Sequence, residues 1–183
     1  MQGKTCESEL LAKGPYNYRF ELEKLESVKE TYQKGTYSRG KRGDATDVLD
    51  YILLAFPNHQ KVLLSAVRYQ FTINNGMKKR APLVSPVECY FQRAMNFDTE
   101  DYITVSLYAY YLNQLKLYEK SAQMYRKALT IDPDNVKILY SYSLVLVKQK
   151  KYTEALEHAQ KVYQTKGVPQ GLKKQLIKLG VWQ

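Results

Sequence analysis

The sequence predicts an all-α protein in which antiparallel helix pairs stack into a solenoid. Residues 102–135 align with residues 136–169 at a spacing of 34 residues, and self-similarity at such a period is typical of repeat architectures. Apolar residues recur at helical spacing within both segments. The turn at residues 132–135, Asp-Pro-Asp-Asn, should end one helix and cap the next, because proline lacks an amide donor and asparagine accepts free amides.

Large and small side chains hold equivalent places in the two repeats. Small residues allow two antiparallel helices to approach closely, and larger side chains fill the space between them. The small residues are Ala109, Ser121 and Ala128, then Ser143 and Ala155; the large ones are Tyr108, Leu112 and Tyr125, then Tyr142 and Leu146.

This arrangement of large, small and turn positions resembles the tetratricopeptide repeat family, whose repeat length is also about 34 residues. Two family positions differ here. The signature Trp is replaced by Val105 and Leu139, and the family's Gly by Ala109 and Ser143. Both repeats are therefore variants of the pattern. The fold that the resemblance implies is a tetratricopeptide-type solenoid, or α-α superhelix.

We expect an irregular N-terminal leader followed by one helical domain. Three glycines punctuate a basic stretch of the leader, which should hold at most one short helix near residues 20–32. Upstream of the regular repeats, residues 57–63 echo residues 133–139 and indicate a degenerate unit. The predicted segments are a leader at 1–43 and a domain at 44–183, divided into a helix at 44–56, a degenerate unit at 59–98 with an inserted loop at 74–85, repeats at 102–135 and 136–169, and a cap at 170–183.

Composition indicates a folded chain without a membrane span. The chain has 183 residues, of which 44% are apolar, and this is ample for a buried core. Its apolar runs are far shorter than the ~20 residues that a span requires. The net charge of +10 comes from short basic groups on separate segments, at 78–80, 148–151 and 173–178. We expect these groups to be solvated helix faces and loop tips, which makes a nucleic-acid partner unlikely.

No constellation of residues predicts catalysis, a metal site or a cofactor. His59 and His158 are the two histidines, and neither has a partner at metal-ligand spacing. There is no Ser, His and Asp arrangement and no glycine-rich phosphate loop after a strand. We expect His59 to help cap its helix; in an enzyme assembled at the groove it would be the one plausible base.

The two cysteines leave two alternatives open. Cys6 lies in the leader and Cys89 lies near the start of a packed helix. In an oxidising compartment a bridge between them would fasten the leader to the helices, with a loop-closure stabilisation of about 4 to 5 kcal/mol. The alternative is two free thiols, with Cys89 buried as a small apolar side chain.

A narrower resemblance bears on location. Residues 14–19 (GPYNYR), 49–51 (LDY) with 55–59 (AFPNH), and 86–91 (PVECYF) resemble segments of a group of exported, periplasmic-type bacterial tetratricopeptide proteins, as do 167–172 (GVPQGL) and 179–182 (LGVW). The resemblance implies a periplasmic or secreted chain whose signal peptide has been removed, and it favours the disulfide. The first fifteen residues lack the apolar region of a signal peptide, which also fits a cytoplasmic protein.

The predicted function is a non-catalytic scaffold or adaptor that binds a peptide or partner subunit. In tetratricopeptide arrays the first helix of each unit lines a concave groove, where ligands usually lie. A basic nucleic-acid adaptor is the alternative, and an enzyme assembled at the groove is a third. The groove-facing residues predicted by position are Arg68, Thr72, Ser106, Tyr110, Asn113, Gln114, Lys137, Tyr140, Leu144 and Lys148.

Overall fold

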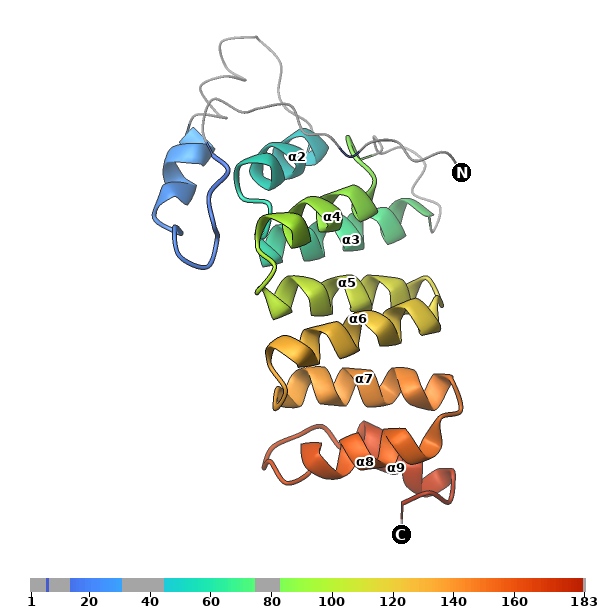
Figure 1. The fold of residues 1–183 in the computed structure, drawn as a ribbon. Helices are drawn as coiled ribbons and strands as arrows, with labels where there is room; N and C mark the ends of the chain where they lie inside the picture. Colours follow the sequence, from blue (N-terminus) through green and yellow to red (C-terminus); the bar gives the residue numbers. More distant parts are fainter. Residues whose placement is uncertain (1–5, 7–13, 31–44, 75–82, 183) are drawn as a thin grey trace. The chain divides into compact units, whose positions relative to one another are not determined.

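The protein is all-α over the residues described by the structure, a computed structural model (Figure 1). These residues are 6, 14–30, 45–74 and 83–182. A short helical segment at 24–30 precedes the named helices. These are α2 (Ala45–Ala55), α3 (Gln60–Asn74), α4 (Val87–Phe97), α5 (Tyr102–Gln114), α6 (Tyr118–Ile131), α7 (Val136–Lys148), α8 (Tyr152–Val162) and α9 (Gly171–Lys178).

The chain forms two compact units, Met1–Thr104 (unit 1) and Val105–Gln183 (unit 2). The boundary lies inside α5, three residues after its start. The division predicted from the sequence, into 1–43 and 44–183, stays a prediction. The helix predicted at 44–56 corresponds to α2, whereas the short helix predicted near residues 20–32 covers only 24–30. Of the predicted inserted loop at 74–85, Asn74 belongs to α3, and residues 75–82 lie outside the described part of the chain.

In unit 1 part of the leader packs against the end of α2 and the residues that follow it. The amide of Tyr16 donates to the carbonyl oxygen of Ala55 at 2.7 Å, and the Tyr16 ring lies 5.4 Å from the ring of Phe56. Val28, from the short helical segment, is fully buried against Phe56. Gly14 has a φ of 103°, and a Cβ there would lie 2.9 Å from the Ala55 oxygen. Only glycine fits this close approach.

A polar network ties the leader to the helix connections of unit 1. The fully buried Asn58 accepts a hydrogen bond from the Tyr18 amide and donates one to the Asn17 side chain, both at 2.9 Å. Asn17 donates in turn to Asp98 at 2.9 Å, and Arg19 pairs with the same carboxylate at 3.2 Å. Buried polar groups must be paired to be tolerated, so Asn58 holds the leader at the α2–α3 corner.

Small residues set the helix spacing in unit 2, as the repeat pattern predicts. Ala109 on α5 and Ser121 on α6 are fully buried, and the Ser121 hydroxyl donates to the Ala109 carbonyl at 2.7 Å. In the next pair Ser143 is equally buried and donates to the Leu139 carbonyl at 2.8 Å. Asn135 caps α7 by accepting from the Ile138 amide at 3.2 Å, as expected.

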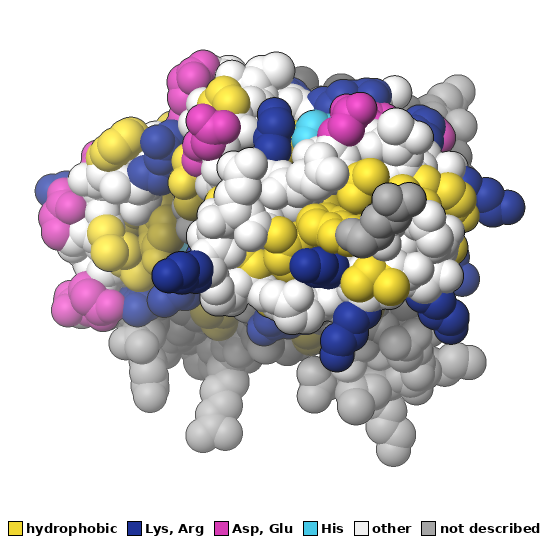
Figure 2. Space-filling view, turned by 90° about the horizontal axis from the view of Figure 1, so that it is seen from below, with side chains coloured by type: hydrophobic (Ala, Val, Ile, Leu, Met, Phe, Trp, Pro, Cys, Tyr) yellow, Lys and Arg dark blue, Asp and Glu magenta, His cyan; other side chains and the backbone are white. Residues whose placement is uncertain are grey.

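The predicted C-terminal cap is present as α9, but only part of its apolar surface is buried. Leu172 and Leu176 are fully buried, whereas Ile177 and Leu179 are 52% and 43% exposed. The covered side of α9 is therefore formed by Leu172 and Leu176, which lie one turn apart, and Ile177 remains exposed. Figure 2 shows apolar side chains at this end of the chain with Lys and Arg around them.

Three helices of unit 2 end in the same turn. Lys116, Lys150 and Gly180 adopt left-handed backbone conformations, with φ of 61°, 62° and 70°. In each turn the next amide, of residue 117, 151 or 181, donates to a carbonyl five residues earlier at 2.9 to 3.0 Å. This is the Schellman motif, in which glycine is the usual residue at the left-handed position. Lysine there carries a steric cost.

We predict that Lys116→Gly and Lys150→Gly each stabilise the protein by about 1 kcal/mol, because glycine relieves the left-handed strain. The matched control is Lys127→Gly, at an exposed position in the interior of α6, which should destabilise by about 1 kcal/mol. Urea unfolding of the oxidised full chain measures all three. A loss of stability in both turn variants would contradict the assignment.

Candidate partner-binding face

The predicted groove residues of unit 2 lie on two adjacent helices. Lys148 at the end of α7 donates to the side-chain oxygen of Asn113 on α5 at 2.9 Å, which fixes the two helices side by side. We call this surface the α5–α7 face. It consists of Ser106, Tyr110, Asn113 and Gln114 from α5 and Lys137, Tyr140, Leu144 and Lys148 from α7.

Exposure differs along the α5–α7 face. Tyr110 is 37% exposed, and Gln114, Lys137 and Lys148 are also exposed, while the other four residues are half-buried. On α6, burial raises the pKa of the Tyr125 phenol to about 12. Tyr125 is therefore neutral at physiological pH, and the charges on the face are those of its lysines.

The α5–α7 face is bounded by the start of α9. A Cβ at Gly171 would lie 3.3 Å from the Tyr140 hydroxyl. Farther on, Tyr163 donates to the Pro169 carbonyl at 2.7 Å and meets Trp182 edge to face at 5.4 Å. The segment after α8 is thus folded back onto unit 2, and Tyr140 marks the edge of the accessible surface.

Two members of the predicted set, Arg68 and Thr72, lie on α3 in unit 1. Arg68 is exposed. The Thr72 hydroxyl donates to the Arg68 carbonyl at 2.9 Å, so it is used within its own helix. Of the eight predicted residues of unit 2, Asn113 and Lys148 are joined across α5 and α7, and Arg68 and Thr72 are described with unit 1 alone.

His59 does not cap its helix through its side chain. Its carbonyl accepts from the Leu63 amide at 2.9 Å, which is a backbone role. The imidazole is buried and stacks on Tyr18 with ring centroids 3.9 Å apart. Its Nδ1 atom has no hydrogen-bond partner among the described residues. The expected cap was wrong, because the His59 ring packs against Tyr18 of the leader.

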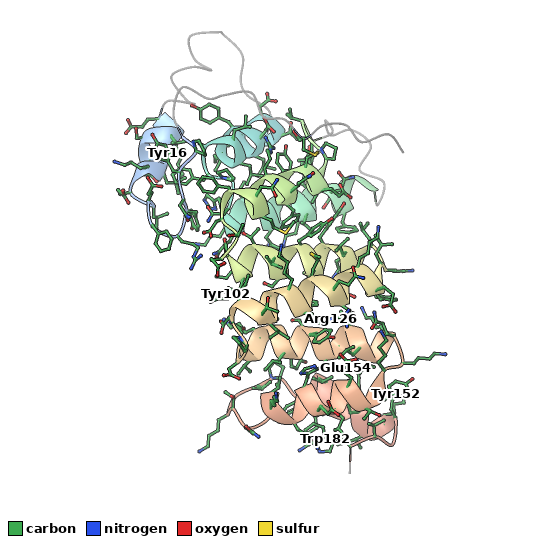
Figure 3. All side chains as sticks on the ribbon, viewed as in Figure 1. Tyr16, Tyr102, Arg126, Tyr152, Glu154 and Trp182 are labelled. Carbon is green, nitrogen blue, oxygen red and sulfur yellow. A yellow bond between two sulfur atoms is a disulfide. The ribbon has the colours of Figure 1, made fainter. Side chains whose placement is uncertain are left out.

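The second histidine lies among aromatic and acidic side chains in unit 2. His158 on α8 packs 5.1 Å from the Tyr142 ring, and burial lowers its pKa. The Tyr142 hydroxyl donates to Glu154 at 2.6 Å; burial first, and then this carboxylate, raises the Tyr142 pKa to about 12. Figure 3 labels Glu154 on α8. The contacts of Tyr142 with His158 and Glu154 join α7 to α8.

We predict a loss of stability as pH falls between about 6.5 and 4. Burial lowers the pKa of His59 to about 4 from its ordinary 6.5, so the unfolded chain binds the proton more readily in this window. The folded state is fully favoured above pH 6.5 and loses up to about 3 kcal/mol below pH 4.

His59→Phe keeps a ring against Tyr18 and should flatten this pH dependence in urea unfolding measured at several pH values. His158 has a lowered pKa as well, so His158→Phe is the matched comparison. An unchanged pH profile in His59→Phe would show that another group causes the loss.

The structure contains a disulfide between Cys6 and Cys89, with Cα atoms 5.2 Å apart and a sequence separation of 83. It joins the leader to α4. Among the described residues there is no cluster of three or more His, Cys, Asp or Glu suited to a metal ion. No helix in the described part of the chain combines the length and apolarity that a membrane crossing needs.

Comparisons with known proteins agree with this architecture. Residues 124–157 match the family described as "Tetratricopeptide repeat", a stretch one repeat long. The solved structure "Crystal structure of MamA" aligns with a TM-score of 0.52 at 14% identity, covering 88% of this chain and 85% of that one. "MamA RS-1 ArsTM double mutant" aligns with a TM-score of 0.51 at 18% identity, covering 86% and 80%. No curated protein matches the sequence.

Two lysines of unit 2 that lie close to the α5–α7 face were not among the groove residues predicted from the repeat positions. Lys116 and Lys150 lie in the turns next to the α5–α7 face and are exposed. The signal available in the sequence was their spacing, since both occupy the same position of the repeat, 34 residues apart. Glycine is expected in such turns, so a lysine there is conspicuous once the turns are known.

Proposed function

Because the chain is a tetratricopeptide-repeat protein, we propose that it is a non-catalytic scaffold that binds a peptide or partner subunit on the α5–α7 face. The observation that carries the proposal is the exposed Tyr110 beside the Asn113–Lys148 pair. Tyrosine offers a large amphipathic contact area at small entropic cost. The amide and the ammonium group supply polar contacts for the backbone or acidic side chains of an extended segment.

The arrangement of these groups favours binding over chemistry. The side-chain oxygen of Asn113 accepts a hydrogen bond from Lys148 at 2.9 Å. The side-chain NH2 group of Asn113 is left to face a ligand. Lys137, one turn from Tyr140, adds a second positive charge to the face. His59, the base that an enzyme would need, is buried in unit 1 with a pKa of about 4. Arg68 and Thr72 on α3 stay proposed contact residues of unit 1 alone.

We predict that a photo-crosslinking amino acid at position 110 captures a partner from an extract of the source cells. The same amino acid at Gln160, an exposed position on α8, is the control and should not capture that partner. Tyr110→Ala with Lys137→Ala should then weaken binding of the captured partner by roughly tenfold or more.

Lys127→Ala with Gln160→Ala removes one lysine as well and should leave binding of that partner unchanged. Both of these control residues are exposed. Equal capture from positions 110 and 160, or unchanged binding in the Tyr110 and Lys137 variant, would rule out the α5–α7 face as the binding surface.

We further propose that the protein works in an oxidising compartment, as a periplasmic or secreted protein of a bacterium. The support is the Cys6–Cys89 disulfide, because such bonds persist mainly outside the reducing cytosol. The resemblance to exported tetratricopeptide proteins points the same way.

Trapping thiols with a maleimide in lysing source cells tests this location. We expect neither cysteine to react before reduction, and both to react after it. Two reactive thiols in the untreated protein would instead indicate a cytoplasmic protein.

A further inference from the structure

The positive charge of the chain belongs almost entirely to unit 2. Between Val105 and Gln183 there are 13 Lys and Arg against 5 Asp and Glu, whereas the first 104 residues hold 15 against 13. A strongly basic unit attracts acidic partners through its long-range field.

Five lysines gather where two turns of unit 2 lie side by side. Figure 1 shows the α5–α6 and α7–α8 turns at the same edge of this unit. The Lys148 ammonium lies 5.3 Å from the centre of the Tyr118 ring, and the Lys151 ammonium lies 3.4 Å from Glu119. We call this surface the basic edge. Its lysines are Lys116, Lys120, Lys148, Lys150 and Lys151.

Little within the protein neutralises the basic edge. Glu119 is its one acidic residue, and its pair with Lys151 is solvent-exposed on both sides, so it contributes little. Lys116, Lys120 and Lys150 are exposed and form no ion pair with any residue that the structure describes. Lys120 and Lys151 also lie at the beginnings of α6 and α8, where the helix dipole disfavours cations. The charges therefore reduce stability where they are.

We propose that the basic edge binds a run of Asp and Glu residues in a partner protein. This inference rests on the proposed function, since the acidic run would belong to the segment held on the α5–α7 face. The two surfaces are continuous, because Lys148 belongs to both and bonds Asn113 of the face. An extended segment leaving the face past Asn113 passes directly over the two turns.

The composition of the edge favours an acidic polypeptide over a nucleic acid. It contains lysine but no arginine, and arginine is the residue whose planar fork suits phosphate recognition. Proteins that bind single strands also offer open aromatic rings on which bases stack. Here one face of the Tyr118 ring is covered by the Lys148 ammonium. Hydrated lysine charges without a stacking platform suit carboxylates spaced along a flexible chain.

The test uses the oxidised full chain and a fluorescein-labelled peptide of alternating Asp and Glu residues, with binding followed by fluorescence anisotropy. Lys116→Gln, Lys120→Gln and Lys150→Gln are combined in one edge variant. The control variant combines Lys127→Gln, Lys161→Gln and Lys166→Gln, which are exposed lysines elsewhere in unit 2, so the two variants have the same net charge. Circular dichroism checks that both are folded.

We expect the edge variant to bind the acidic peptide roughly tenfold more weakly at about 50 mM salt, and the control variant to bind within about threefold of the original protein. Binding should weaken steeply by about 200 mM salt. A peptide of Asn and Gln of the same length should not bind.

Equal weakening in the two variants would overturn the proposal, because net charge alone would then explain it. So would failure of the original protein to bind the acidic peptide. Tighter, edge-dependent binding of a ten-nucleotide thymidine strand would also overturn it and assign the edge to nucleic acid. The variant that combines Tyr110→Ala with Lys137→Ala separates the two proposals. It should still bind the acidic peptide. If it loses only the captured partner, that loss concerns the α5–α7 face and not the basic edge.

Discussion

The close contact between α5 and α6 at Ala109 and Ser121 is the constraint on which unit 2 depends. The Ser121 hydroxyl reaches the Ala109 carbonyl at 2.7 Å, a distance that no larger pair of side chains would allow at this crossing. Because the spacing inside a helix pair fixes where the next pair stacks, it also sets the distance between α5 and α7. The Asn113–Lys148 bond, and with it the α5–α7 face, follows from two small side chains.

In unit 1 a polar contact has the corresponding importance. The α2–α3 corner contains the fully buried Asn58, whose amide group satisfies the leader at Tyr18 and Asn17. An apolar side chain there would leave the Tyr18 amide without this partner, at a cost of about 1 to 3 kcal/mol. The leader is therefore part of the folded unit where Asn17 and Tyr18 meet this corner.

The helices and their turns could be predicted because periodicity, proline and capping residues are local signals. Asn135 capping α7 is an example. The failures concern contacts between distant segments. The sequence predicts His59 as a helix cap, whereas its ring stacks on Tyr18, about forty residues earlier. Whether Cys6 meets Cys89 depends on the path of the leader, which spacing does not encode. The exposure of Ile177 depends on how α9 is oriented against α7 and α8.

The left-handed turns have a consequence for how the protein could change its length. Lys116 and Lys150 recur once per repeat, and Gly180 takes the third equivalent turn with no side chain. Duplicating residues 136–169 would extend the solenoid and place another lysine at the next turn, whereas the glycine would remain at the terminus. The number of charges along the edge therefore grows with repeat number, so gene duplication alone could adjust the length of partner segment that the protein accommodates.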